Sequence, residues 1–228
     1  MGRALDVSLS YISSVMALGA GMRVHRSAEP ASALVLYEFE SCPFCRKVRE
    51  GLSALDLDAL LLPCPPGGRR YRPEAERLGG KQQFPLLVDG DHPPLYESEA
   101  ILRTLSDRYA GGALPATLRT GPVSSLRAGL SSLRRVGTVR ARPSRVPDKP
   151  LELYNYEASP YCRLVREELC SLELWHKQIN VARGSRKRTD FVARSGKMMV
   201  PFLVDPNTGE SLFESADIIR YLRRTYAE

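Results

Sequence analysis

The feature that most constrains this sequence is an internal repeat. Residues 34–57 read LVLYEFESCPFCRKVREGLSALDL and residues 151–174 read LELYNYEASPYCRLVREELCSLEL, so the two segments align without a gap at an offset of 117. Two later blocks recur in the same order, KQQFPLLVD (81–89) with KMMVPFLVD (197–205), and YESEAILRTL (96–105) with FESADIIRYL (213–222). Three matched blocks in one order indicate a duplicated domain of about 77 residues.

Length and composition agree with two small domains. The chain has 228 residues, and domains typically hold roughly 100–200 residues or fewer. Its 43% hydrophobic and 26% charged residues are typical of a globular protein with a buried core, which excludes a disordered or collagen-like chain. Its 5 cysteines are too few for a disulfide scaffold. No window approaches about 18 uninterrupted apolar residues, so we expect a soluble or peripheral protein.

Each repeat predicts the same order of elements, βαβ-α-ββα. An alternating apolar run from Leu34 predicts the first strand, and Ser41 or Ser159 is expected to cap the following helix. Pro43 and Pro160 suit a first helical turn, where the missing N–H costs nothing. The further strands are expected at 57–62, 84–89 and a short one ending at Tyr96, and at 174–181, 200–205 and one ending at Phe213. This order predicts an α/β fold in which each repeat has a mixed four-stranded sheet with helices on both faces.

Charge separates a linker from the two expected domains, which span 34–110 and 151–228. The linker 111–150 holds eight basic residues and one acid, so its net charge equals the +7 of the whole chain. Within it, 124–137 predicts an amphipathic helix, and 1–33 is expected as a similar helical extension. These helices either cap the domains or present a basic face to an acidic protein or an anionic membrane. Nucleic acid is not expected, because the domains are near neutral and no stacking aromatics accompany the arginines.

A CxxC motif in the first repeat is the strongest chemical signal. Cys42 and Cys45 stand where a strand turns into a helix, and the N-terminus of a helix favours a thiolate. The pKa of Cys42 is therefore expected below its free value of about 8.5, with Cys45 one turn away and able to attack a mixed disulfide. The spacing also occurs in zinc sites, but with no second CxxC and no nearby His pair we expect no metal.

Two further pairs in each repeat complete the expected site. Phe84-Pro85 and Val200-Pro201 each precede a strand, where a cis bond to proline would expose the backbone of the preceding residue beside the thiol. Glu97-Ser98 and Glu214-Ser215 open the last helix, where backbone and side-chain groups can hold a carboxylate and an ammonium. Together these elements predict a slot for a small zwitterionic thiol peptide.

With these motifs the chain resembles the glutaredoxins and the N-terminal, thioredoxin-fold domain of glutathione S-transferases. The CPFC sequence is similar to the glutaredoxin nucleophile, and the ES dipeptide is similar to the transferase γ-glutamyl site. The resemblance implies two tandem thioredoxin-like domains that use glutathione as a co-substrate. It assigns Cys42 as nucleophile and, as glutathione-binding residues, Phe84, Pro85, Glu97 and Ser98. Similar two-domain proteins of plants and algae imply a chloroplast location.

Two departures from the family pattern bear on function. No all-helical domain of the transferase kind is expected, which argues against ordinary conjugation of glutathione. In the second repeat Ser159 replaces the nucleophile, so it either caps its helix or hydrogen-bonds a bound thiolate. Cys162, like Cys64 and Cys170, is expected to be unreactive. The equivalents of the binding residues in the second repeat are Val200, Pro201, Glu214 and Ser215.

Three functions remain open at this stage. The first is a glutathione-dependent thiol–disulfide oxidoreductase that uses Cys42 and Cys45. The second is a redox-silent glutathione-binding or scaffold protein that acts through protein or membrane-surface contacts, and the third is conjugation or isomerisation of a small electrophile. The complete CPFC set in the first repeat favours the first function.

Overall fold

The computed structural model describes residue 24, residues 27–112, residue 118 and residues 139–228. The amphipathic helix expected at 124–137 and the one expected near the N-terminus lie outside these residues. In the described part of the chain, no helix is long and apolar enough to cross a membrane.

Both repeats fold in the predicted order. The first contains β1 (Leu34–Glu38), α2 (Pro43–Ala54), β2 (Ala59–Pro63), α3 (Arg72–Gly79), β3 (Leu86–Asp89), β4 (Leu95–Tyr96) and α4 (Ser98–Tyr109). The second contains β5 (Leu151–Asn155), α6 (Pro160–Ser171), β6 (His176–Asn180), α7 (Arg188–Ser195), β7 (Phe202–Val204), β8 (Ser211–Phe213) and α8 (Ser215–Tyr226). The thioredoxin-like order βαβ-α-ββα is confirmed twice, and the described residues form no all-helical domain.

β2 begins two residues later than the apolar pattern predicts. The N–H of Leu57 donates to the carbonyl of Leu52 at 2.9 Å, so Leu57 still closes the turn that ends α2. Asp56 has a positive φ of 54° in this turn. The equivalent Leu174 donates to Leu169 at 2.9 Å, which delays β6 in the same way.

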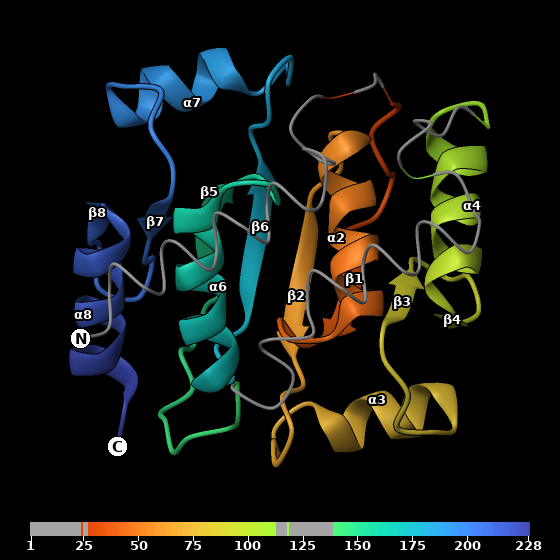
Figure 1. The fold of residues 1–228 in the computed structure, drawn as a ribbon, viewed down its shortest axis with the longest axis horizontal. Helices are drawn as coiled ribbons and strands as arrows, with labels where there is room; N and C mark the ends of the chain where they lie inside the picture. Colours follow the sequence, from red (N-terminus) through yellow and green to blue (C-terminus); the bar gives the residue numbers. More distant parts are fainter. Residues whose placement is uncertain (1–23, 25–26, 113–117, 119–138) are drawn as a thin grey trace.

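The strands of both repeats form one continuous sheet in the order β4-β3-β1-β2-β6-β5-β7-β8. Within each repeat the first strand runs parallel to the second and antiparallel to the third. The repeats join where β2 and β6 pair antiparallel, with Leu60 opposite Lys177 (Figure 1). These two residues are equivalent in the repeat alignment, so an approximate two-fold axis passes between them. The sequence predicted two four-stranded sheets but not their union.

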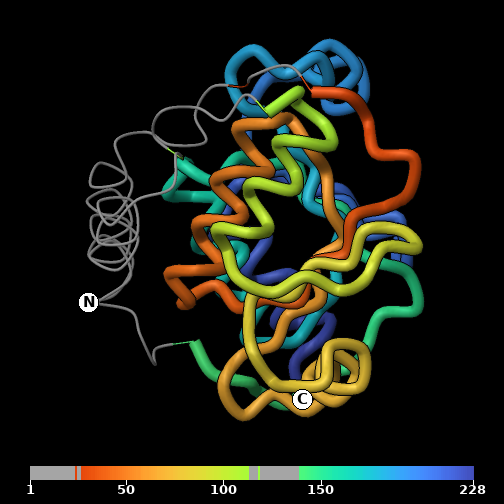
Figure 2. Tube along the Cα trace, turned by 90° about the vertical axis from the view of Figure 1, so that its right-hand side faces the viewer, coloured from red at the N-terminus to blue at the C-terminus, as the bar shows by residue number. Residues whose placement is uncertain are grey.

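The helices cover the two faces of this sheet unequally. α2, α4, α6 and α8 lie side by side on one face, while α3 and α7 lie toward opposite ends of the other face (Figures 1 and 2). On the first face Leu36 and Leu61 pack with Val48 and Leu52 of α2. On the second face Leu62 belongs to the cluster that α3 covers. Successive residues of each strand therefore serve different cores.

A buried group of charged side chains, here called the interrepeat charge cluster, forms ion pairs between the two repeats. It consists of Glu38, Glu40, Arg49, Glu157 and Arg166, all at most 3% exposed at the side chain. Arg49 lies 2.9 Å from Glu40 and 3.1 Å from Glu157, and Arg166 lies 3.1 Å and 3.0 Å from the same two carboxylates. Both arginines and both of these glutamates are related by the repeat offset. Each repeat thus supplies one pair to a closed, fully desolvated square of charges.

Candidate functional site

The N-terminus of α2 holds the predicted nucleophile. Cys42 is the N-cap residue, and its Sγ accepts a hydrogen bond from the backbone N–H of Cys45 at 3.3 Å. The sequence prediction that Ser41 caps this helix is wrong, because the cap position aligned with Ser159 is occupied by the cysteine itself. The thiol therefore receives the N–H that a serine oxygen usually accepts.

The two thiols of the CxxC motif differ in acidity. Hydrogen bonds from the Cys45 thiol, and from the backbone N–H groups of Cys45 and Phe44, lower the pKa of Cys42 against the opposing effect of burial. Burial first, and then the hydrogen bond to Cys42, raises the pKa of Cys45 well above its usual range. Cys42 is 4% exposed and Cys45 is fully buried. The Cys42 thiol is therefore the more acidic of the two, and the Cys45 thiol is the hydrogen-bond donor to it.

The buried carboxyl group of Glu38 acts electrostatically on both thiols. Glu38 is the last residue of β1, and its side chain contacts Arg49 in the interrepeat charge cluster. Burial is the main reason that its pKa rises to about 7, and its negative charge in turn raises the pKa values of Cys42 and Cys45. The second repeat has Asn155 at this position, where the nucleophile is replaced by serine. Sequence reasoning missed Glu38, although the Glu–Asn difference accompanies the Cys–Ser difference.

The other predicted residues of the first repeat gather at the same end of the sheet. Pro85 follows a cis peptide bond after Phe84 and precedes Leu86, which pairs with Tyr37 of β1. Pro85 is thus opposite the end of β1. Phe84 packs edge-to-face on Phe39 with ring centroids 6.1 Å apart.

The start of α4 joins this group through a side chain that the sequence did not single out. Gln83 donates to the carboxylate of Glu97, which connects the segment before Pro85 to the N-terminus of α4. Glu97 is exposed and Ser98 is buried. The guanidinium of Arg72 lies 4.9 Å from the Phe84 ring and donates to the carbonyl of Cys64 at 2.9 Å. Arg72 therefore adds a positive charge beside the predicted slot.

The second repeat reproduces the helix cap without a thiol. Ser159 is the N-cap of α6, and its Oγ accepts from the N–H of Cys162 at 3.3 Å. Cys162, Cys64 and Cys170 are all buried, and burial raises the pKa of each thiol. The second cis bond lies between Val200 and Pro201. The cap interpretation of Ser159 agrees with this geometry.

Two cavities flank Val200 in the second repeat. One, of about 410 Å³, is lined by four of the five predicted residues, namely Val200, Pro201, Glu214 and Ser215, together with Tyr161 and Met199. The Oγ of Ser215 is buried and has no hydrogen-bond partner among the described residues. Ser159 is not among the lining residues.

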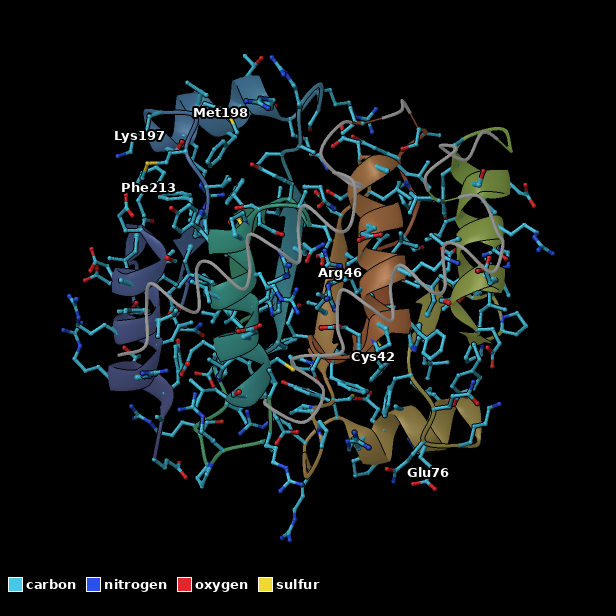
Figure 3. All side chains as sticks on the ribbon, viewed as in Figure 1. Cys42, Arg46, Glu76, Lys197, Met198 and Phe213 are labelled. Carbon is cyan, nitrogen blue, oxygen red and sulfur yellow. The ribbon has the colours of Figure 1, made fainter. Side chains whose placement is uncertain are left out.

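The other cavity, of about 490 Å³, contains residues that sequence reasoning missed. Its lining includes Tyr156, Arg183, Arg188 and Met198. Figure 3 shows Met198, Lys197 and Phe213 in one repeat and Cys42 in the other. The only sequence signal for these residues is their position, since Tyr156 aligns with Phe39 and precedes the helix cap by three residues. Both of these cavities are therefore in the repeat that lacks the nucleophile.

Comparisons with known proteins identify the domains. The family profile described as the glutathione S-transferase N-terminal domain matches the chain twice, at residues 36–113 and 153–228. The glutathione S-transferase-like protein tpcF of Aspergillus fumigatus is 35% identical over 82 residues, and the match covers 36% of each chain. The chain thus spans about a third of the length of that relative. The trimeric glutathione transferase TDR1 of Leishmania is a structural neighbour with a TM-score of 0.31 and 15% identity, over 87% of this chain and 68% of that one. The matches at both repeats show that this chain belongs to the family of glutathione S-transferase N-terminal domains, of which it carries two copies.

Proposed function

We propose that the protein is a glutathione-dependent thiol–disulfide oxidoreductase with Cys42 as its nucleophile. The observation that carries this proposal is the position of the Cys42 sulfur at the N-terminus of α2, where it accepts the Cys45 N–H at 3.3 Å and where hydrogen bonds lower its pKa. A thiolate at neutral pH is the species that attacks a disulfide. Membership in the glutathione S-transferase family supports glutathione as the thiol co-substrate.

The proposed reaction removes glutathione from a mixed disulfide. The Cys42 thiolate attacks the glutathionyl sulfur, the substrate S–S bond breaks, and the substrate leaves as a thiolate that takes up a proton. A second glutathione thiolate then attacks the same sulfur, which releases oxidised glutathione and restores the Cys42 thiolate. Alternatively the Cys45 thiol loses its proton and attacks the Cys42 sulfur, which releases glutathione as a thiolate and gives an internal disulfide. Two glutathione molecules then reduce this disulfide and leave as oxidised glutathione. Electrons balance because one disulfide, that of the substrate, is consumed and one disulfide, oxidised glutathione, is formed.

The test measures release of thiol from a glutathionylated peptide in the presence of glutathione. Cys42→Ser should abolish turnover, whereas Cys45→Ser should retain a substantial part of it, because external glutathione can resolve the intermediate. Cys64→Ala serves as the matched control, since that thiol is buried and its raised pKa keeps it protonated. A wild-type protein without activity, or a Cys42→Ser variant as active as wild type, would refute the proposal.

A second function, redox-silent binding of glutathione, is favoured by the cavities of the second repeat. The cavity at Glu214 and Ser215 has a volume of about 410 Å³, in the range of small-molecule sites. Calorimetric titration with glutathione distinguishes the two functions. Binding that persists in Cys42→Ser and Glu97→Gln but is lost in Glu214→Gln would assign the ligand to the second repeat. Binding lost in Glu97→Gln alone would assign it to the thiol-bearing repeat.

A further inference from the structure

A third cavity lies away from both of these sites, where the two repeats meet. Its volume is about 530 Å³, and its lining includes Pro30, Asp58, Leu60, Lys177 and Lys187. Leu60 alternates with Leu61, which faces α2, so the cavity lies on the opposite face of the sheet. The segment that leads into β1 runs along this side of the molecule (Figure 2).

The two-fold relation between the repeats shows why this space is open. Leu60 and Lys177 pair across β2 and β6 and are equivalent in the repeat alignment. Each residue near this pair in one repeat therefore has an equivalent, in the other repeat, on the opposite side of the two-fold axis. In that register, carried one step further, Leu62 is opposite Trp175. The residue equivalent to Trp175 is Asp58. A large aromatic side chain on one side of the axis is thus matched by a short carboxylate on the other.

Trp175 fills its side of the axis. Its indole packs against the cluster that contains Leu62, and its ring N–H donates to the carbonyl of Pro147 at 3.0 Å. Pro147 is equivalent to Pro30, which lines the cavity on the other side. On the Pro147 side, an indole ring thus fits between the backbone and the sheet. Asp58 is too small to occupy the equivalent volume.

The charges around the cavity are partly used. Lys187 contacts the carboxylate of Asp58 and lies 3.3 Å from that of Asp56, and Arg186 lies 2.9 Å from Glu29. Lys177 is exposed and has no ion-pair partner among the described residues. It is the equivalent of the apolar Leu60, and the two side chains line the cavity next to each other. A cation is thus available to an acidic ligand beside the apolar surface.

We propose that this cavity binds a small planar heteroaromatic acid of the indole carboxylate class. The ring occupies the volume that Trp175 fills on the other side of the axis. Its N–H donates to the Pro30 carbonyl or to Asp58, and its carboxylate pairs with Lys177. The volume of about 530 Å³ is that of small-molecule sites, which range over roughly 300–1,000 Å³. No redox step is involved, so this site is independent of Cys42.

Fluorine NMR titration of the full chain tests this proposal with two probes, neutral fluoroindole and a fluorinated indole carboxylate. Wild type should bind both saturably and the carboxylate more tightly. Asp58→Trp, which copies the filled side of the axis, should abolish binding of both. Lys177→Glu should weaken the carboxylate about tenfold and leave fluoroindole within about twofold. Arg103→Glu, a matched charge reversal at an exposed position of α4, should change neither affinity.

The outcomes separate this site from the proposed redox function. Cys42→Ser should bind both probes as wild type does. The proposal fails if wild type shows no saturable binding, or if a folded Asp58→Trp variant binds normally. Should circular dichroism show that Asp58→Trp is unfolded, the Lys177→Glu titration decides, because Lys177 is exposed and its replacement disturbs no described ion pair. Equal loss of both probes in Lys177→Glu, or unchanged affinity for the carboxylate, would overturn the assignment of Lys177.

Discussion

Arg166 of the second repeat binds Glu40 of the first in a two-pronged contact. Its Nε lies 3.1 Å from one carboxylate oxygen of Glu40 and its Nη2 lies 3.2 Å from the other. Such fork-to-fork pairs are the most directional ion pairs that proteins form. Because the reciprocal Arg49–Glu157 pair is related by the two-fold axis, the same side chains that hold one repeat in place also orient the other.

Removing one member of the interrepeat charge cluster should destabilise the whole chain. Arg166→Met leaves the buried Glu40 and Glu157 with Arg49 and, 3.9 Å from Glu40, Arg163 as their cations. Removing one partner of a buried ion pair costs about 3–5 kcal/mol. Urea denaturation should show this loss in the free energy of unfolding. Arg166→Met/Glu157→Gln should lose less than the single variant, because the charge balance is restored. Arg220→Met, at an exposed pair, is the control, and an effect of Arg166→Met no larger than that of the control would contradict this prediction.

Glu38 should make stability depend on pH in the range from about 4.5 to about 7. Its folded pKa is raised to about 7 from 4.5, so the folded protein holds this proton more tightly than the unfolded chain does. The resulting stabilisation is complete below the unfolded pKa and is lost as the pH rises through the folded pKa. Glu38→Gln removes this dependence. The free energy of unfolding of the variant minus that of wild type should therefore increase with pH over this window.

His176 also makes the free energy of unfolding depend on pH, and comparing the variant with wild type removes its contribution. Its pKa is lowered to about 4, mainly by burial, so the stability it contributes is lost as the pH falls from about 6.5 to about 4. That change has the opposite sign and is present in both proteins, so it cancels in the difference. A difference that stays flat from pH 4.5 to pH 7 would show that Glu38 titrates normally.

Cys45→Ala should raise the pKa of Cys42. The thiol of Cys45 is the largest of the influences that lower this pKa, and alanine removes the donor while keeping the backbone N–H. The pH dependence of alkylation by iodoacetamide measures the shift. Cys162→Ala, at the equivalent position of the second repeat, should leave the Cys42 profile unchanged. An unaltered profile in Cys45→Ala would mean that the helix N-terminus alone sets the acidity.

Ser159→Cys should create a second reactive thiol. The new sulfur would cap α6 as Cys42 caps α2, and its pKa is expected below about 8.5. Neutral Asn155 replaces Glu38 behind it, so the pKa should also fall below that of Cys42. The measurement is alkylation against pH in a Cys42→Ser background. Ala158→Cys, one residue before the cap, is the control and should not alkylate at low pH.

Most of the secondary structure could be predicted from the sequence because it depends on local signals that occur twice. The apolar alternation from Leu34, Pro43 in the first helical turn, and the apolar runs after Pro85 and Pro201 each marked an element that the structure contains. The exact cap could not be chosen between adjacent residues, because Ser41 is the better capping residue by type. The structure shows that Cys42 is the N-cap residue, because its side chain accepts the hydrogen bond from the Cys45 N–H.

The joining of the two sheets could not be predicted, for a physical reason. Glu40 and Arg49 recur as Glu157 and Arg166, but charged side chains at matching positions usually indicate a solvated helix face. Their burial depends on the antiparallel pairing of β2 with β6, which is a contact between distant segments. The three cavities could not be predicted either, because each is lined by residues from segments that only the tertiary structure brings together.

The pairing of β2 with β6 has a consequence for the duplicated chain as a whole. In an isolated repeat, β2 would form an open edge whose unpaired N–H and C=O groups can recruit other chains into aggregates. Here each repeat covers that edge of the other, and only the short strands β4 and β8 remain at the borders of the sheet. Loss of either copy would therefore expose the edge of β2 or β6 in the copy that remains, so the thiol-free copy protects the thiol-bearing copy whether or not it binds a ligand.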